Sequence, residues 1–223
     1  MMANGSTAFR DKKLVIWDWN GTLLNDTAVS IESMNRMLAR RGMSLLDEFR
    51  YKQIFRFPVK DYYVDLGFDF STERYEELSV EFISNYRELQ HKAGLHEGVQ
   101  ELLRSFHEKG LSQVILSAME RNTLISDISL RGIEGYFTAI LGPEDHLAQG
   151  KTEIAERFLD TLNISPQHIL MIGDTMHDFE VADLIGCECI LVSQGHHSFE
   201  RLVSTGTCVQ KNLSDVFNLP INP

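Results

Sequence analysis

The sequence of 223 residues has no long apolar run, few basic residues and only three cysteines. Its apolar runs are no longer than a β-strand, so the sequence predicts no membrane-spanning helix. The 21 Lys and Arg residues are outnumbered by 32 Asp and Glu residues, which gives a formal net charge of −11. Because proteins bind a nucleic-acid backbone with clustered basic side chains, this balance argues against nucleic acid as the main partner.

The cysteines, Cys187, Cys189 and Cys208, include no C-x-x-C pair. A zinc site needs about four ligands in a compact arrangement, and this pattern is instead typical of reduced, buried thiols in a cytoplasmic protein. Residues 1–12 lack the apolar segment of a secretory signal and are expected to form a flexible tail. We therefore expect a cytoplasmic location, and the sequence leaves the oligomeric state open.

Short apolar runs alternate with helical patterns over most of the chain. A hydrophobic content of 43% with 24% charged residues is typical of a folded globular protein. An alternation of this kind predicts βαβ units and a parallel sheet that is covered on both faces. The fold class is therefore α/β, with a doubly wound parallel-sheet core. The expected strands occupy residues 14–17, 113–116, 137–141, 169–172 and 189–192, and helices are expected over residues 99–108, 121–130 and 151–162.

A helical segment interrupts this order after the first strand. It contains several helical patterns and no convincing buried strand, and its first helix is expected over residues 28–40. Asn25, Asp26 and Thr27 offer capping oxygens for that helix, and Tyr86 lies in an amphipathic stripe that indicates packing. The predicted domains are a tail at 1–12, a core at 13–26 and 94–223, and an inserted helical domain at 27–93.

Polar side chains stand where several of the expected strands end. Asp18, Ser117 and Asp174 each follow an apolar run, Asp178 comes four residues after Asp174, and Lys151 begins a helix. Ligands of open α/β sheets bind beyond the carboxyl ends of the strands. Two carboxylates from different strands, with a hydroxyl and a lysine, suit a divalent cation together with a phosphate.

These residues resemble the four motifs of the haloacid dehalogenase (HAD) superfamily. The run DWNGTL from Asp18 is similar to the first motif, D-x-D-G-T, and the run GDTMHD from Gly173 is similar to the fourth. Ser117 and Lys151 match the second and third motifs. The resemblance covers roughly residues 13–195 and is nearest to the phosphoglycolate phosphatase-like branch. It implies a Rossmann-like HAD core with a helical C1 cap inserted after the first strand.

The resemblance also implies the reaction, which is the hydrolysis of a small-molecule phosphate through an aspartyl-phosphate intermediate. Asp18 would be the nucleophile. The cofactor would be Mg²⁺, held by the Asp18 carboxylate, the backbone carbonyl of Asn20, Asp174 and Asp178.

The phosphate and the rest of the substrate would be bound by different parts of the chain. The resemblance assigns the transferring phosphoryl group to Thr22, Ser117 and Lys151. Residues 55–61 are similar to the specificity loop of C1 caps, where Arg56 or Lys60 would pair with a substrate carboxylate, as in phosphoglycolate. The alternative for both is an ordinary exposed cation. The expected partner is thus a small-molecule phosphate, with neither nucleic acid nor a membrane.

Asn20 departs from the family motif, whose second acidic residue protonates the leaving alcohol and then activates water. An amide donates hydrogen bonds but neither releases nor takes a proton near neutral pH. Since general acid–base catalysis contributes roughly 10²–10⁴-fold in rate, this change matters. One interpretation is a phosphatase for good leaving groups, such as acyl or aryl phosphates, or one with a surrogate base. The histidines to consider as surrogates are His177, His196 and His197.

Two other interpretations stay open. The first is a reaction other than phosphate-ester hydrolysis, as in the phosphonatases of the superfamily, which use a cap lysine as a Schiff base and therefore need a desolvated amine. The second is a phosphate-binding or regulatory module without turnover. The lysines within the insert are Lys52, Lys60 and Lys92.

Overall fold

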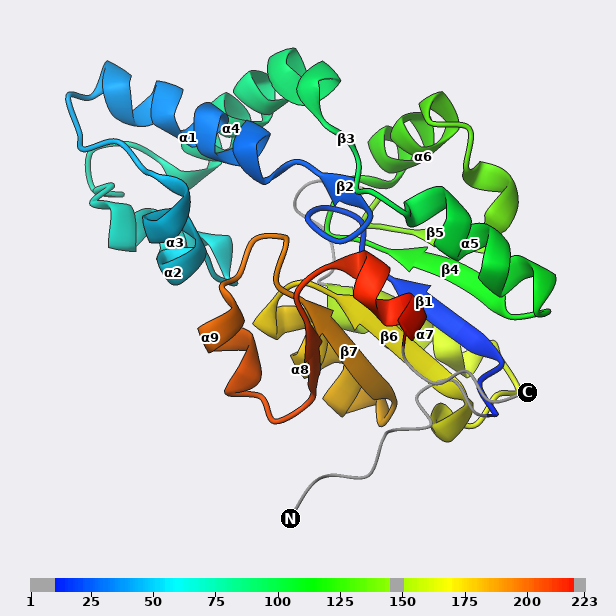
Figure 1. Ribbon diagram of the computed structural model, residues 1–223. Coiled ribbons are helices and arrows are strands. Elements are labelled where there is room, and N and C mark those ends of the chain that lie inside the picture. The colour runs from blue at the N-terminus through cyan, green and yellow to red at the C-terminus, as the bar shows by residue number, and fades with distance from the viewer. Residues whose placement is uncertain (1–10, 145–150, 219–223) are drawn as a thin grey trace.

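The structure is a computed structural model that describes residues 11–144 and 151–218. Figure 1 shows a twisted sheet flanked by helices, with a second group of helices set apart at its upper left. All but the last two residues of the predicted tail at 1–12 lie outside the described residues.

The sheet has six parallel strands in the order β5-β4-β1-β6-β7-β8. β1 is central because it is an uninterrupted apolar run, buried at every position. Strands are added first on one side of β1 and then on the other, so the sheet has its topological switch point at β1. The strands are β1 (Leu14–Trp17), β4 (Ser112–Leu116), β5 (Ala139–Leu141), β6 (Ile169–Gly173), β7 (Glu188–Val192) and β8 (Cys208–Gln210).

Helices cover both faces of the sheet. Val15 and Trp17 of β1 pack toward one set of helices, and Leu14 and Ile16 pack toward the other. The first face carries α5 (Val99–Glu108), α6 (Arg121–Leu130) and the 3₁₀ turns η2 (Glu134–Tyr136) and η4 (Leu213–Asn218). The second carries α7 (Lys151–Asp160), α8 (Met176–Ile185) and α9 (Phe199–Val203), with η3 (Pro166–His168) leading into β6. The sheet core is thus buried on both sides.

The second group of helices forms a unit with its own hydrophobic core, which we call the helical insert. It consists of α1 (Thr27–Arg40), α2 (Glu48–Ile54), α3 (Val59–Leu66), α4 (Tyr75–Leu89) and η1 (Gln90–Lys92). Two short antiparallel strands, β2 (Leu24–Asn25) and β3 (Gly94–Leu95), join it to the sheet core. The buried residues of the insert are Met34, Met37, Leu38, Leu46, Tyr51, Tyr62, Tyr63, Leu66, Phe68 and Leu78.

The insert is also fastened to the sheet core at α2. Arg201 of α9 donates two hydrogen bonds, of 2.8 Å to the carbonyl of Lys52 and 2.7 Å to that of Phe55. The last carbonyls of a helix have no partner within the helix, so this guanidinium satisfies groups that α2 leaves open. Gln53 adds a 3.1 Å bond to Ser198.

The α/β fold class is confirmed, and the differences from the predicted elements are local. The helix expected to reach residue 162 ends at Asp160, because Thr161 and Leu162 donate to carbonyls only three residues back. The strand expected from residue 137 begins at Ala139, since Phe137 still closes η2. β2 and β3 contain two residues each and give no periodic signal in the sequence.

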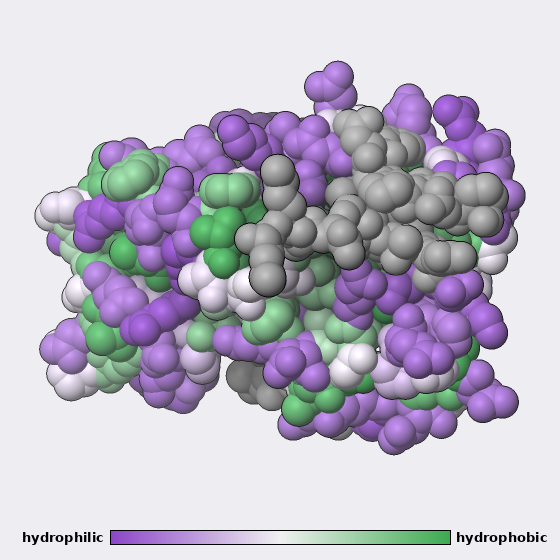
Figure 2. Space-filling model, turned by 60° about the horizontal axis from the view of Figure 1, so that its bottom comes forward, coloured by the Kyte–Doolittle hydropathy of each residue, from purple (hydrophilic) through white to green (hydrophobic). Residues whose placement is uncertain are grey.

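The surface is mixed in character. Figure 2 shows a face on which hydrophilic residues predominate and hydrophobic residues form small separate groups. Among the exposed large hydrophobic residues of the described ranges, Phe49 is the most exposed aromatic, at 76%. None of the helices within the described ranges is long and apolar enough to cross a membrane. The cysteines Cys187, Cys189 and Cys208 are free thiols.

Candidate active site

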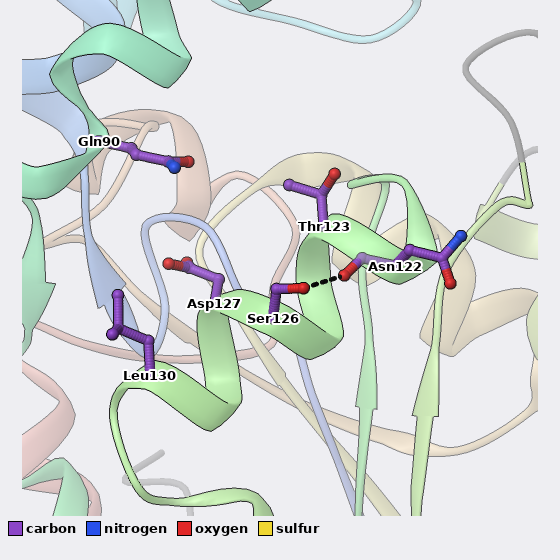
Figure 3. A pocket seen from close by; sticks show the side chains of 6 residues that line it. All are labelled: Gln90, Asn122, Thr123, Ser126, Asp127 and Leu130. Carbon is purple, nitrogen blue, oxygen red and sulfur yellow. Dashed lines mark hydrogen bonds between the residues drawn. The ribbon is translucent and has the colours of Figure 1, made fainter.

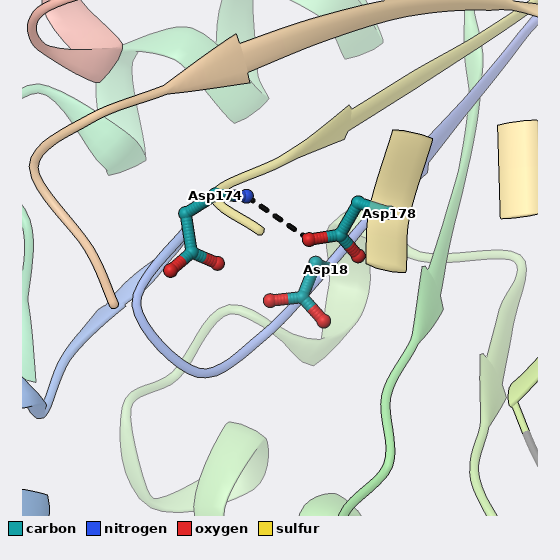
Figure 4. Close-up of side chains that lie close together, drawn as sticks. All are labelled: Asp18, Asp174 and Asp178. Carbon is teal, nitrogen blue, oxygen red and sulfur yellow. Dashed lines mark hydrogen bonds between the residues drawn. The ribbon is translucent and has the colours of Figure 1, made fainter. Parts of the chain in front are cut away.

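Three carboxylates meet at the carboxyl edge of the sheet (Figure 4). Asp18 follows β1, Asp174 follows β6, and Asp178 lies in the first turn of α8. Because β1 and β6 are neighbours, the Asp18 amide continues their ladder with a 2.9 Å bond to the Ile172 carbonyl. One oxygen from each carboxylate lies within 4.8 Å of the other two, and all three residues are buried.

Lys151 at the start of α7 places its ammonium between two of these carboxylates. Its Nζ lies 2.5 Å from Oδ1 of Asp18 and 2.5 Å from Oδ1 of Asp178. Thr22 donates its hydroxyl to Asp174 at 2.8 Å and lies 3.2 Å from Asp18. The structure therefore brings five of the predicted site residues into one buried, hydrogen-bonded cluster.

The cluster contains more negative than positive charge. Burial, with repulsion from Asp178 and Asp174, raises the pKa of Asp18 to about 8 although Lys151 opposes this. Burial likewise raises the pKa of Asp174 to about 6. Burial acts in the same direction on Asp178, but Lys151 outweighs it and lowers the pKa of that carboxyl. A buried all-oxygen donor set that is short of positive charge fits a hard divalent cation.

Glycines provide the room for this packing. Gly21 has a φ of +77°, in the left-handed region that favours glycine. A Cβ on Gly21 or on Gly195 would overlap the Asp174 carboxylate, and one on Gly173 would overlap Asp178. The loops around the cluster can therefore approach it only because these positions lack a side chain.

Asn20 is held on the side facing the insert. Its amide nitrogen donates to Asp26 at 2.8 Å and to the Tyr86 hydroxyl at 3.0 Å. Asp26 accepts further bonds from Tyr86 at 2.7 Å and from the Gly21 amide at 2.8 Å. Burial would raise the pKa of Asp26, but His196 and these hydrogen bonds lower it. Both amide hydrogens of Asn20 are thus occupied by a buried, ionised carboxylate and its tyrosine neighbour.

His196 extends this network across the interface. Its Nδ1 lies 2.9 Å from the Tyr51 hydroxyl of α2, and its Nε2 lies 3.4 Å from Asp26. Its backbone amide donates to Asp174 at 2.6 Å. Burial would lower its pKa, but Asp26 and Asp174 raise it to about 9. Both ring nitrogens are therefore engaged, which leaves neither available to a substrate in this arrangement.

The other two candidate surrogate bases also have partners. His197 accepts a 3.0 Å bond from the Met176 amide, and burial lowers its pKa to about 3. His177 lies 3.2 Å from Glu180 on the outer side of α8. Ser117 follows β4, the other neighbour of β1, and its hydroxyl accepts a 3.1 Å bond from the Met119 amide. The strand pairing places Ser117 at the same sheet edge as Asp18.

The insert approaches the cluster through the turn at 55–58. The Phe57 ring lies 4.8 Å from the His177 ring, at an interplanar angle of 32°. The Phe55 ring lies 5.3 Å from that of His196. Residues that flank Asp174 in the fold are therefore covered by aromatic rings of the insert.

The two cations predicted to recognise a substrate carboxylate have partners within the insert. Arg56 forms a 2.9 Å ion pair with Asp65. The Lys60 ammonium lies over the ring of Phe70 at 5.3 Å and that of Tyr75 at 5.9 Å. Their role in substrate binding stays a prediction.

A separate hollow of about 340 Å³ lies on α6, facing η1 (Figure 3). Three of its polar side chains, those of Thr123, Ser126 and Asp127, are already bonded within the fold. Ser126 donates to the Asn122 carbonyl at 2.8 Å, and Asp127 accepts from the Trp19 indole at 3.1 Å. We assign no chemistry to this hollow, which is lined by Gln90, Asn122, Thr123, Ser126, Asp127 and Leu130.

The family follows from a comparison with known proteins. Residues 15–192, which include every residue of the carboxylate cluster, match the haloacid dehalogenase-like hydrolase family. The chain belongs to this family. The predicted HAD resemblance is thereby confirmed.

Relatives of this HAD hydrolase cover most of its length. A 5′-nucleotidase of Pseudomonas aeruginosa is 29% identical over 196 residues, which is 84% of this chain and 86% of that protein. A phosphoglycolate phosphatase of Vibrio vulnificus is 24% identical over 86% of this chain and 89% of its own. The crystal structure of a predicted phosphatase from Clostridium acetobutylicum superposes with a TM-score of 0.76 at 21% identity, over 93% of this chain and 97% of that one.

Sequence reasoning missed part of the site. Asp26 was expected to cap α1, and it does stand at the N-cap, but its side chain makes no capping bond and binds Asn20 instead. The sequence indicates only packing for Tyr86, and it gives no separate signal for Gly195. The sequence signal that could have found this network is an acidic residue, Asp26, six positions after the motif asparagine.

Proposed function

We propose that this HAD hydrolase is a phosphatase that removes phosphate from a small molecule through an aspartyl-phosphate on Asp18. The observation that carries the proposal is the Asp18 carboxylate at the switch point of the sheet, 2.5 Å from the Lys151 ammonium. The family membership and the phosphatase and nucleotidase names of the relatives support it.

The donor set also supports a Mg²⁺ cofactor. Asp18, Asp174, Asp178 and the backbone carbonyl of Asn20 would hold the ion. When bound, Mg²⁺ would supply positive charge that offsets the excess of carboxylates and polarises the phosphate. Three buried carboxylates with oxygens within 4.8 Å of one another are the physical reason to expect such charge there.

The chain's own groups would carry the transfer. An Asp18 oxygen forms a bond to phosphorus while the bond from phosphorus to the leaving oxygen breaks, and that oxygen keeps the electron pair. Lys151, Thr22 and Ser117 would bind the other phosphoryl oxygens and stabilise their charge. Water then attacks the aspartyl-phosphate and releases phosphate, which restores the Asp18 carboxylate. The helical insert would act as the cap that excludes bulk water.

The phosphonatase alternative finds less support. Schiff-base chemistry needs a desolvated amine. Lys52 is mostly buried, but its ammonium is paired with Glu48 at 2.9 Å, and the half-exposed Lys92 is paired with Glu32 at 2.9 Å. The cytoplasmic location inferred from the cysteines stays a prediction.

The test is Mg²⁺-dependent phosphate release from p-nitrophenyl phosphate, acetyl phosphate and phosphoglycolate. Asp18→Asn should lower turnover by roughly 10⁴-fold or more, because it removes the nucleophile. Asp183→Asn, an exposed change on α8, is the matched control and should have no effect. Unchanged turnover in Asp18→Asn would overturn the assignment. Phosphate binding without any release from the wild type would favour the regulatory module.

A further inference from the structure

The surface that the insert turns toward the carboxylate cluster is aromatic. Phe57 lies against His177, the residue directly before Asp178, and Phe55 lies against His196, whose amide binds Asp174. Phe57 is only partly buried, and the His177 side chain is 22% exposed. These two partly exposed rings therefore adjoin residues that are next to, or bonded to, two carboxylates of the cluster.

The cations nearest this turn are already engaged. Arg56 is paired with Asp65, and the Lys60 ammonium lies over two rings of the insert. Lys52 of α2 lies 2.9 Å from Glu48. A substrate carboxylate would have to compete with these partners, whereas the Phe57 ring contacts two other rings, that of His177 at 4.8 Å and that of Phe55 at 5.6 Å.

The chemistry of Asn20 points the same way. Both of its amide hydrogens are occupied by Asp26 and Tyr86, and it has no proton to give to a departing oxygen. A phenol has a pKa of about 10, far below the value of about 15.7 for bulk water, which aliphatic alcohols approach. A phenolate therefore leaves without a proton donor far more readily than an alkoxide does.

We propose that the substrate is an aryl phosphate, with its ring bound between Phe57 and His177; this rests on the proposed phosphatase function. Aromatic rings associate at centroid distances of about 4.5–7 Å. The substrate ring would separate the two rings, which now lie 4.8 Å apart, and have one on each side. As the bond from phosphorus to the phenolic oxygen breaks, the phenolate keeps the electron pair and takes its proton from water.

Three substrates separate ring binding from leaving-group chemistry. Phenyl phosphate has an aromatic ring and a good leaving group. Benzyl phosphate has an aromatic ring but an aliphatic leaving oxygen. Cyclohexyl phosphate has neither an aromatic ring nor a good leaving group. The expected order of kcat/KM is phenyl, benzyl, cyclohexyl. Benzyl should exceed cyclohexyl by about tenfold through ring contacts alone. Equal values for benzyl and cyclohexyl phosphate would overturn the proposal while leaving the phosphatase function intact.

Variants locate the ring site. Phe57→Ala should lower the benzyl-to-cyclohexyl ratio to about one, and Phe57→Tyr should keep it. Phe49→Ala removes a ring that is 76% exposed on the same helical insert, and it should leave the ratio unchanged. A ratio that survives in Phe57→Ala would show that the ring binds elsewhere and would overturn the assignment.

A binding measurement tests the ring site independently of turnover. If no phosphate is released above the Asp18→Asn blank, the proposed function fails, and calorimetry with phenylphosphonate and cyclohexylphosphonate then decides on the ring site. Tighter binding of phenylphosphonate that is lost in Phe57→Ala would support the site. Equal binding of the two phosphonates would reject it.

Discussion

At the candidate site, the sheet core supplies charged groups and the helical insert supplies aromatic rings. Asp18, Asp174 and Lys151 come from the ends of strands or the start of a helix in the core. Phe55 and Phe57 come from a turn of the insert. The charged groups are fixed by a continuous backbone ladder, while the rings belong to a unit with a separate hydrophobic core.

This difference suggests a division of labour. The core would set the reaction, because the same edge of the sheet must hold nucleophile, phosphate and cation for any substrate. The insert would select the group beyond the phosphate. Changes in the core should therefore affect all phosphate substrates alike, whereas changes in the insert should alter the ratio between substrates.

Apart from replacement of the nucleophile itself, the largest effect is expected at Lys151. Lys151→Met should lower kcat/KM for phenyl and cyclohexyl phosphate by the same factor, roughly 10²–10³. It should also cost about 3–5 kcal/mol in the free energy of unfolding measured with urea, since two buried carboxylates lose their cation. Lys109→Met, at an exposed position on the surface of the sheet core, serves as the control. If the loss in kcat/KM differed tenfold between the two substrates, the proposed division of roles between sheet core and insert would be wrong.

The next effect is expected where the two regions meet. Asn20→Asp alone would set a carboxylate against Asp26, whose oxygen lies 2.8 Å from the amide nitrogen, and should destabilise the protein. The exchange Asn20→Asp with Asp26→Asn keeps one acid and one amide in contact. It should raise hydrolysis of cyclohexyl phosphate by about 10²-fold, and that of phenyl phosphate less. Equal gains for both would argue against a role in protonating the leaving group.

The smallest effect is a pH dependence of the free energy of unfolding that arises from groups in the sheet core. The pKa values of Asp18 and Asp174 in the ion-free protein are raised to about 8 and about 6, above a value of about 3.9 in the unfolded chain. The folded state therefore binds more protons, and its stability should fall as pH rises from about 4 to about 8, by about 2 kcal/mol or more. His196, raised to about 9, acts in the same direction above about 6.5.

Urea unfolding of the metal-free protein across this pH range measures the effect. Added Mg²⁺ should flatten the dependence, because it binds the ionised carboxylates of the folded state. Asp18→Asn should remove most of the slope without added metal. A slope that is identical in the wild type and in Asp18→Asn would place the unfavourable charge outside the cluster.

The fold and the charged half of the site could be predicted because each depends on local sequence. A run such as residues 14–17 has few alternatives to a buried strand, and parallel strand ends meet at one edge, so Asp18 and Asp174 had to converge. The contact of Asn20 with Tyr86 depends on how α4 returns to the core, 66 residues later. No periodic pattern in the sequence predicts the contact between Asn20 and Tyr86. The stripe that contains Tyr86 indicates only which side of the helix is apolar.

The bonds from Arg201 to the carbonyl oxygens of Lys52 and Phe55 have a consequence for how this protein can change. Carbonyl oxygens are present whatever side chain a residue carries. Substitutions at positions 52 and 55 therefore keep the acceptors that hold α2 against α9. The side chains of the insert can change, and with them the substrate it recognises, while these two bonds between the insert and the sheet core remain. The rings facing the cluster can be exchanged for other chemistry, one residue at a time, without redesigning the joint that holds them in place.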